Sequence, residues 1–153
     1  MNLHTKQGVL TAAASLLVLV LSAGSARAEG PACSEATLRG DYGFTVTGQI
    51  LGGPTAGPVT GVAMTSFEGN GNLTQVDHIV HNGSLPAVDW RPGTGTYSLN
   101  PDCTGTMEID FTDGSPSLHL SIVVVRLGRE IRTVVSNPGT ALTSIGIKKD
   151  SIF

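Results

Sequence analysis

The segment Asp77–His81 contains the first residues whose types suggest chemistry. His78 and His81 are potential zinc ligands, but an offset of three along a strand places them on opposite faces. Asp77 and His81 share a face, yet four residues of strand separate them by about 13 Å. One metal ion therefore cannot bind either pair without a bulge, although His119 could approach either in space. We expect no metal site and no cofactor.

Glu108 and Asp110 are a second candidate pair. They lie about 6.6 Å apart on one strand face, a spacing at which two carboxylates can divide the acid and base roles of glycoside hydrolysis. Met107, Ile109 and Phe111 form the other, apolar face, so we expect both carboxylates to point to solvent. No serine lies in a G-x-S-x-G segment, and the sequence assigns no catalytic residue.

The stretch Phe67–Leu73, FEGNGNL, places Gly69 and Gly71 among acidic and amide side chains, as a cation-binding or phosphate-binding loop would. Glu68 is its only carboxylate, whereas calcium loops present several anionic oxygens. Thr74 stands where a dinucleotide loop would have a third glycine, and a strand follows in place of a helix. The stretch therefore predicts a tight hairpin turn with positive φ at glycine.

Residues 1–28 have the three parts of a secretory signal. Lys6 lies in a short basic start, Ala12–Leu21 is apolar, and Ala26–Ala28 offers small residues for cleavage. The apolar run is shorter than the roughly 20 residues that cross a bilayer, so we expect no membrane span after cleavage. This pattern predicts a signal peptide at 1–28 and a secreted or periplasmic single domain at 29–153.

The charge of the processed chain disfavours nucleic acid as a partner. Removal of Lys6 and Arg27 leaves seven basic residues against twelve acidic ones, a formal charge of −5. The basic residues form no long run, and a solvated surface is the simplest explanation of all seven. They are Arg39, Arg91, Arg126, Arg129, Arg132, Lys148 and Lys149.

Cys33 and Cys103 are the only cysteines, and an even number in an exported chain predicts a disulfide. Closing a loop of about 70 residues stabilises the fold by roughly 4 kcal/mol in the chain-entropy description. A lipidated Cys33 is the rival interpretation, but Gly30–Ala32 precedes it in place of a small-residue box led by leucine. A zinc or thiol-catalysis role lacks partners at useful spacing.

From Gly40 onward, β-branched and aromatic runs alternate with turn residues every 8 to 12 residues or so, which predicts an all-β fold. Short turns between consecutive runs predict a meander of eight antiparallel strands after the signal helix. The runs lie near Tyr42–Thr47, Val59–Phe67, Leu73–His81, Gly95–Asn100, Cys103–Phe111, Ser117–Arg126, Glu130–Ser136 and Ala141–Lys148.

Eight meandering strands can close into a barrel, which removes both exposed sheet edges. A two-sheet sandwich with a disulfide between the sheets is the alternative. Ser34–Leu38 can form one helical turn capped by Ser34, and this turn could plug one end of the barrel. We expect one apolar interior to be lined by the side chains of Tyr42, Phe44, Tyr97 and Met107.

The run Ile122–Val125 breaks the alternation, because four β-branched residues place apolar groups on both faces. Its outer face should therefore be covered. The N-terminal segment, brought near by the disulfide, or a second subunit could cover it, so a homo-oligomer is a further possibility.

Several pieces of the chain together resemble a group of small exported bacterial proteins of unknown function. The pieces are Cys33–Phe44, Phe67–Leu73, Gly95–Tyr97 and Asp102–Thr106. The resemblance implies an exported β domain, similar in architecture to allene-oxide-cyclase-like and lipocalin-like barrels. Gly40–Tyr42 resembles the lipocalin start motif, with Tyr where that family has Trp, and no cyclase catalytic residue can be placed.

We therefore expect an exported protein that binds a small apolar or amphipathic molecule without catalysis. The alternatives are a barrel enzyme of the isomerase or cyclase type and a structural envelope protein. A buried charged group in an otherwise apolar lumen would favour the enzyme, whereas a filled lumen with a large apolar exterior would favour assembly.

Overall fold

Alternation of inward and outward side chains produces eight strands within residues 32–150, the part of the chain that the computed structural model describes. In β1, for example, Tyr42 and Phe44 are buried while Gly43 and Thr45 are exposed. The strands are β1 Arg39–Ile50, β2 Gly57–Glu68, β3 Asn72–His81, β4 Arg91–Leu99, β5 Thr104–Phe111, β6 Leu118–Val125, β7 Glu130–Val135 and β8 Thr140–Lys148.

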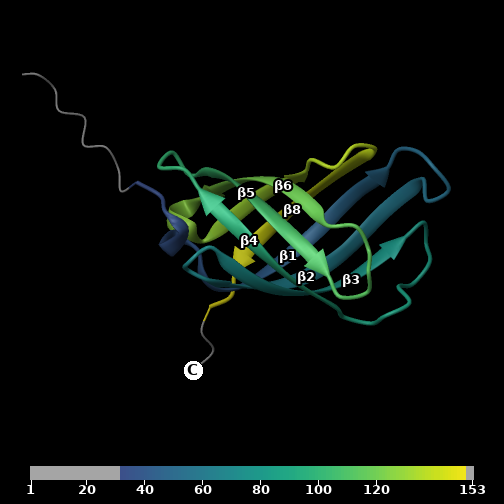
Figure 1. Ribbon diagram of the computed structural model, residues 1–153, viewed down its shortest axis with the longest axis horizontal. Coiled ribbons are helices and arrows are strands. Elements are labelled where there is room, and N and C mark those ends of the chain that lie inside the picture. The colour runs from purple at the N-terminus through teal and green to yellow at the C-terminus, as the bar shows by residue number, and fades with distance from the viewer. Residues whose placement is uncertain (1–31, 151–153) are drawn as a thin grey trace, which may run out of the picture.

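The strands form a closed antiparallel barrel in chain order (Figure 1). Each strand pairs with the next, and β1 also pairs with β8, from Tyr42 opposite Lys148 to Ile50 opposite Thr140. Closure leaves no edge strand for unwanted pairing. The predicted barrel is thus confirmed over the sandwich, whereas the predicted signal helix lies outside the described residues.

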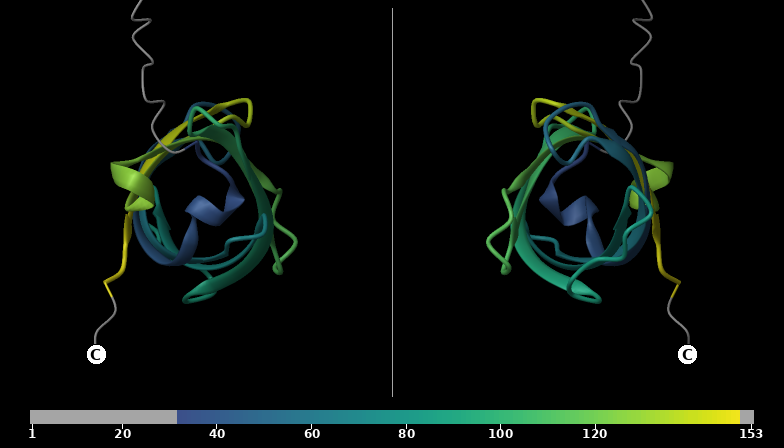
Figure 2. Two further views of the ribbon diagram at one scale, coloured as in Figure 1. Left: turned by 90° about the vertical axis from the view of Figure 1, so that its left-hand side faces the viewer. Right: turned by 90° about the vertical axis from the view of Figure 1, so that its right-hand side faces the viewer.

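A short 3-10 helix, η1 (Glu35–Thr37), closes one end of the barrel. Figure 2 shows it within the barrel opening. Leu38, which follows it, is fully buried, and the Tyr97 hydroxyl donates to the Glu35 carbonyl oxygen at 2.8 Å. The same hydroxyl accepts a hydrogen bond from the Gly69 amide at 3.1 Å. The predicted plug is therefore present and is tied to β4 directly and, through Tyr97, to the turn that contains Gly69.

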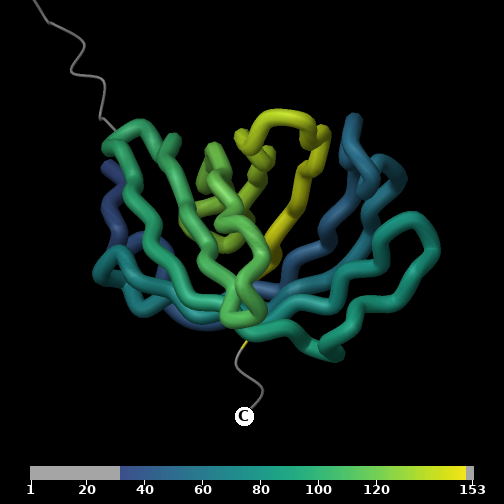
Figure 3. The backbone as a smooth tube through the Cα atoms, turned by 45° about the vertical axis from the view of Figure 1, so that its right-hand side comes forward, coloured from purple at the N-terminus to yellow at the C-terminus, as the bar shows by residue number. Residues whose placement is uncertain are grey.

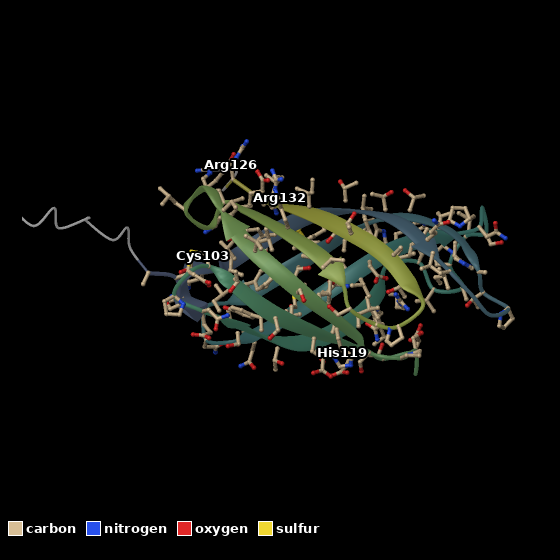
Figure 4. The ribbon with its side chains drawn as sticks, turned by 90° about the horizontal axis from the view of Figure 1, so that it is seen from above. Cys103, His119, Arg126 and Arg132 are labelled. Atoms are coloured by element: carbon tan, nitrogen blue, oxygen red, sulfur yellow. A yellow bond between two sulfur atoms is a disulfide. The ribbon has the colours of Figure 1, made fainter. Side chains whose placement is uncertain are left out.

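The Cys33–Cys103 disulfide attaches the plug to the connection between β4 and β5, confirming the predicted bridge. Figure 4 shows Cys103 at the end of the barrel where the chain enters it. Disulfides persist in oxidising compartments, which is consistent with the predicted export. No helix within residues 32–150 is long and apolar enough to cross a membrane.

Large aromatic side chains fill the barrel next to the plug. Phe67 packs edge to face against Tyr42 and Tyr97, with ring centroids 5.2 and 5.0 Å apart. The Tyr42 hydroxyl donates to the carbonyl oxygen of Gly128, in the β6–β7 connection. This half of the barrel is consequently a solid core, which we call the closed end.

The stretch Phe67–Leu73 is the β2–β3 hairpin, as predicted. Gly69 and Gly71 have φ angles of +83° and +96°, which glycine adopts without strain. The Asn72 amide donates to the Asn70 side-chain oxygen at 3.0 Å and so fixes the turn. In the described structure, this stretch therefore serves as a connection between two strands at the closed end.

The outer face of β6 is not covered as we expected. Ile122 and Val124 point into the barrel, but Val123 points outward and is 43% exposed. The segment Ser34–Leu38 cannot cover it, because that segment lies within the barrel opening (Figure 2). Within residues 32–150 the N-terminal segment thus does not cover this run, and cover by a second subunit stays a prediction.

The remaining connections, β1–β2, β3–β4, β5–β6 and β7–β8, lie at the opposite end of the barrel, the open end. The β1–β2 and β3–β4 connections extend beyond the barrel there (Figure 3). The Asn82 amide donates to the Pro58 carbonyl oxygen at 2.8 Å, which ties the β3–β4 connection to β2.

Candidate functional site

A cavity of about 530 Å³ occupies the open half of the barrel. This volume is within the range of natural small-molecule sites, about 300 to 1,000 Å³. Pro116 and Asn137, from two connections, line it at the open end. Its walls are mostly apolar and include Phe44, Ile79, Met107, Ile109, Leu120 and Leu142.

Small inward side chains next to the packed closed end help to leave the cavity empty. Along β2 the inward positions run from Phe67 at the closed end through Thr65, Ala63 and Gly61 to Val59 near the open end. The Phe44 ring lies where a side chain on Gly146 would stand, since a Cβ there would overlap the ring. The aromatic residues thus fill the closed end and leave the other half hollow.

The four predicted lumen residues are all buried inside the barrel, but they divide between its two halves. Phe44 and Met107 line the cavity. Tyr42 and Tyr97 lie in the closed end, where their hydroxyl groups bond backbone carbonyl oxygens. Only the first two therefore have the position that contact with a molecule in this cavity requires.

A largely buried ion pair lies within the mostly apolar cavity. Arg91 opens β4 opposite Asp77 of β3. Its Nε donates to Asp77 Oδ1 at 3.1 Å and its Nη2 donates to Asp77 Oδ2 at 2.9 Å. The Asp77 side chain is 4% exposed and that of Arg91 is 21% exposed. Both carboxylate oxygens are thus occupied by one guanidinium group.

The guanidinium group of Arg91 is also held from β5 and from the connection after it. Its Cζ lies 3.6 Å from the centroid of the Phe111 ring, a cation–π contact. Its Nη1 donates to Ser115 Oγ at 3.3 Å and lies 3.7 Å from Asp113 Oδ2. Four groups therefore restrain Arg91 against the cavity wall.

Uncharged polar side chains extend this network across the lumen. The Thr65 hydroxyl donates to Gln75 Oε1 at 3.1 Å, and Gln75 Nε2 donates to Asp77 Oδ2 at 3.4 Å. On the β7–β8 wall, the hydroxyls of Thr133 and Ser144 bond each other at 2.7 Å. A bound molecule would thus meet hydroxyl groups on these two walls as well as apolar side chains.

His78 and His81 lie on opposite faces of β3, as predicted. His78 Nδ1 is 2.7 Å from Asp89 Oδ1 outside the barrel, whereas His81 lines the cavity. The Nε2 atom of His81 is sealed from solvent and has no hydrogen-bond partner among the described residues. No cluster of three metal-ligand side chains occurs within residues 32–150.

Glu108 and Asp110 face outward from β5, while Met107, Ile109 and Phe111 are buried, as the alternation predicted. His119 is on the outside too: its Nδ1 is 3.8 Å from Glu108 Oε1. Figure 4 shows its side chain pointing away from the barrel. His119 therefore approaches neither Asp77 nor His81 in the lumen.

The expectation that all seven basic residues lie on a solvated surface is wrong for Arg91, which lines the cavity. β4 begins at Arg91, four residues before the predicted run at Gly95. Arg91 lies an even number of residues before the buried Tyr97, so both side chains point to the inner face of the strand. Asp77 likewise shares its parity with the buried Leu73 and Gln75. Two opposite charges on inward positions of neighbouring strands were the signal that could have revealed the pair.

No protein-family model, no curated protein and no solved structure matches this chain. The functional proposal therefore depends on the cavity and its polar groups.

Proposed function

We propose that the protein binds a small apolar or amphipathic molecule in the open half of its barrel. The observation that carries this proposal is the cavity of about 530 Å³, which is lined mainly by apolar side chains and reaches the open end. The plug at the other end makes it a blind pocket, so a bound molecule enters and leaves by one route.

Desolvation supplies the driving force for such binding. Transfer of a methylene group from water to an apolar site contributes about 0.8 kcal/mol. A ten-carbon chain thus gains up to about 8 kcal/mol, from which the loss of translational and rotational freedom must be subtracted. We expect dissociation constants from the micromolar to the millimolar range for simple chains, and tighter binding for a molecule shaped to the cavity.

Calorimetric titration with 1-decanol tests the proposal, with a paired set of variants. Ala63 lines the cavity, whereas Val62, its neighbour in β2, is 45% exposed on the outer face. Ala63→Phe should weaken binding at least tenfold because the ring occupies the cavity. Val62→Phe adds the same ring outside and should leave the affinity unchanged.

Absence of binding to every member of a panel of fatty alcohols, fatty acids and terpenoids would contradict the proposal. The panel result should be joined to native mass spectrometry of protein purified from its own host. Detection of no bound small molecule there, with no heat and no thermal shift across the panel, would exclude a carrier role.

A barrel enzyme of the isomerase type is the second candidate. It is favoured by the Asp77–Arg91 pair and His81, which are ionisable groups in an apolar cavity. An imidazole can move a proton between two positions of a bound molecule without a cofactor. The open cavity gives no support to a structural envelope role, for which we expected a filled lumen.

Deuterium uptake distinguishes the enzyme from the carrier. Small molecules extracted from the host should be incubated with the protein in heavy water and followed by mass spectrometry. Exchange or rearrangement that is lost in His81→Asn, together with continued binding by that variant, would support an isomerase. Binding of a molecule that neither takes up deuterium nor rearranges would support the carrier.

A further inference from the structure

The charges that line the cavity cancel each other. Apart from His81, Asp77 and Arg91 are the only titratable side chains among the described residues that line it. They bond to each other through two hydrogen bonds of 2.9 and 3.1 Å. The lumen therefore contains one negative and one positive group, each already satisfied by the other.

Neither charge is free to turn toward a bound molecule. Asp77 accepts from Arg91 with both oxygens, and its side chain is almost fully buried. Arg91 is fixed by Asp77, by Ser115 and by the face of the Phe111 ring. An anionic or cationic head group would have to break this pair to gain a partner of opposite charge.

We propose that the Asp77–Arg91 pair makes the cavity selective for molecules with an uncharged polar group, such as an alcohol or a carbonyl compound. This inference rests on the proposed binding function. An ion transferred into an apolar site without a counter-ion loses hydration that nothing replaces, and a buried pair that loses one partner leaves the other uncompensated. A hydroxyl or carbonyl group can instead bond the Thr133 and Ser144 hydroxyls.

The test compares three molecules with the same chain and different charge: 1-decanol, decanoate and decylammonium. All three titrations are made at one pH, so that the charge of the protein is the same in each. All concentrations stay below micelle formation. We expect wild-type protein to bind 1-decanol at least tenfold more tightly than either ion.

Two reciprocal variants show whether the pair causes this selectivity. Asp77→Asn removes the buried partner of Arg91 and leaves only the partly exposed Asp113, 3.7 Å away, near the guanidinium group. The affinity for decanoate relative to 1-decanol should therefore rise at least tenfold. Arg91→Gln leaves Asp77 unpaired, and the corresponding ratio for decylammonium should rise by a similar factor. Glu108→Gln removes a charge from the outer face and is the control, for which both ratios should stay at the wild-type value. Circular dichroism spectra establish that each variant is folded.

The outcomes separate the two proposals. If no neutral or charged decyl compound binds, the proposed function itself fails. If wild-type protein binds decanoate or decylammonium as tightly as 1-decanol, the binding function stands and the selectivity inference is overturned. Unchanged ratios in folded Asp77→Asn and Arg91→Gln also overturn it. If neither variant folds, the ranking of the three affinities measured for wild-type protein decides whether the selectivity inference stands.

Discussion

At the scale of single residues, Asp77 is a buried carboxylate whose negative charge is compensated by Arg91. Removing one member of a buried ion pair leaves the other without compensation, which costs about 3 to 5 kcal/mol. Asp77→Ala should lower the free energy of unfolding by about this amount, measured by urea denaturation. The loss falls toward the lower figure to the extent that Asp113, 3.7 Å from Arg91, takes over the guanidinium.

Glu108→Ala is the matched control for this prediction. It removes an exposed carboxylate from a strand, and the one basic side chain that contacts it among the described residues is His119, at 3.8 Å. Its unfolding midpoint should stay near that of the parent, because exposed ion pairs contribute little. Equal midpoints for Asp77→Ala and Glu108→Ala would mean that the buried pair adds nothing to stability.

Tyr42 and Tyr97 are the only tyrosines of the chain, and both are buried. Burial raises the pKa of Tyr42 to about 12 and also raises the pKa of Tyr97. The folded state thus keeps protons that the unfolded state releases near pH 10. The stabilising contribution of protonated Tyr42 is fully present below about pH 10. The free energy of unfolding should fall by about 2 to 3 kcal/mol through Tyr42 alone as the pH rises to about 12.

Near-ultraviolet absorbance and urea midpoints between about pH 9 and about pH 12 check this prediction. Tyrosinate absorbance should appear together with loss of structure. Tyr42→Phe should flatten the pH dependence and also lower stability by about 1 to 3 kcal/mol at neutral pH, because the buried Gly128 carbonyl loses its donor. Tyrosine ionisation near pH 10 in a protein that remains folded would contradict the burial argument.

Strand alternation was sufficient to place the four predicted lumen residues inside the barrel, but not to show which of them line the cavity. Tyr42, Phe44, Tyr97 and Met107 were all predicted inside from their parity. Their division between a packed half and a hollow half depends on the plug and on the packing of large against small side chains around the barrel. That packing involves neighbours from different strands, which parity within one strand does not reveal.

At the scale of elements, the β2–β3 hairpin is a connection whose conformation restricts its sequence. Gly71 has a φ of +96°, and a Cβ there would meet the Tyr97 carbonyl oxygen at 3.3 Å. Valine strongly disfavours this backbone region. Gly71→Val should therefore destabilise the fold by about 1 to 3 kcal/mol, measured by thermal and urea denaturation.

Gly43→Val is a control with the same chemical change. Gly43 lies in β1, a Cβ there would meet no atom within 4 Å, and its φ is an ordinary one for a strand. Valine favours strands, so this variant should be as stable as the parent or more stable. Coincident melting curves for Gly71→Val and the parent would show that the hairpin tolerates a side chain at positive φ.

All eight strands could be predicted from the sequence because period-two alternation and turn residues are local signals. The largest shift of a single strand boundary is at β4, which begins at Arg91 and not at Gly95. Pro92 and Gly93 are poor strand residues, so local propensity ended the predicted run too early. Pairing with β3, from Asn72 opposite Thr96 to Asp77 opposite Arg91, extends the strand in spite of that propensity.

At the scale of the whole molecule, the barrel separates stability from binding along its axis. The closed end contains η1, the disulfide and the aromatic cluster of Tyr42, Phe67 and Tyr97. The open end contains the cavity and the Asp77–Arg91 pair. Strands continuous between the two ends are the connection through which a change at one end would reach the other.

Mutation of both cysteines to alanine tests whether the two ends are independent. The disulfide joins residues separated by 70 positions, and its loss should lower the free energy of unfolding by about 2 to 4 kcal/mol. Neither cysteine lines the cavity, so the affinity of the folded variant for 1-decanol should stay within about twofold of the parent, since distant changes are nearly additive. Ala63→Phe should show the opposite pattern, with weak binding and little loss of stability. A tenfold loss of affinity in the cysteine variant would mean instead that the plug sets the shape of the cavity, and that the closed end takes part in binding.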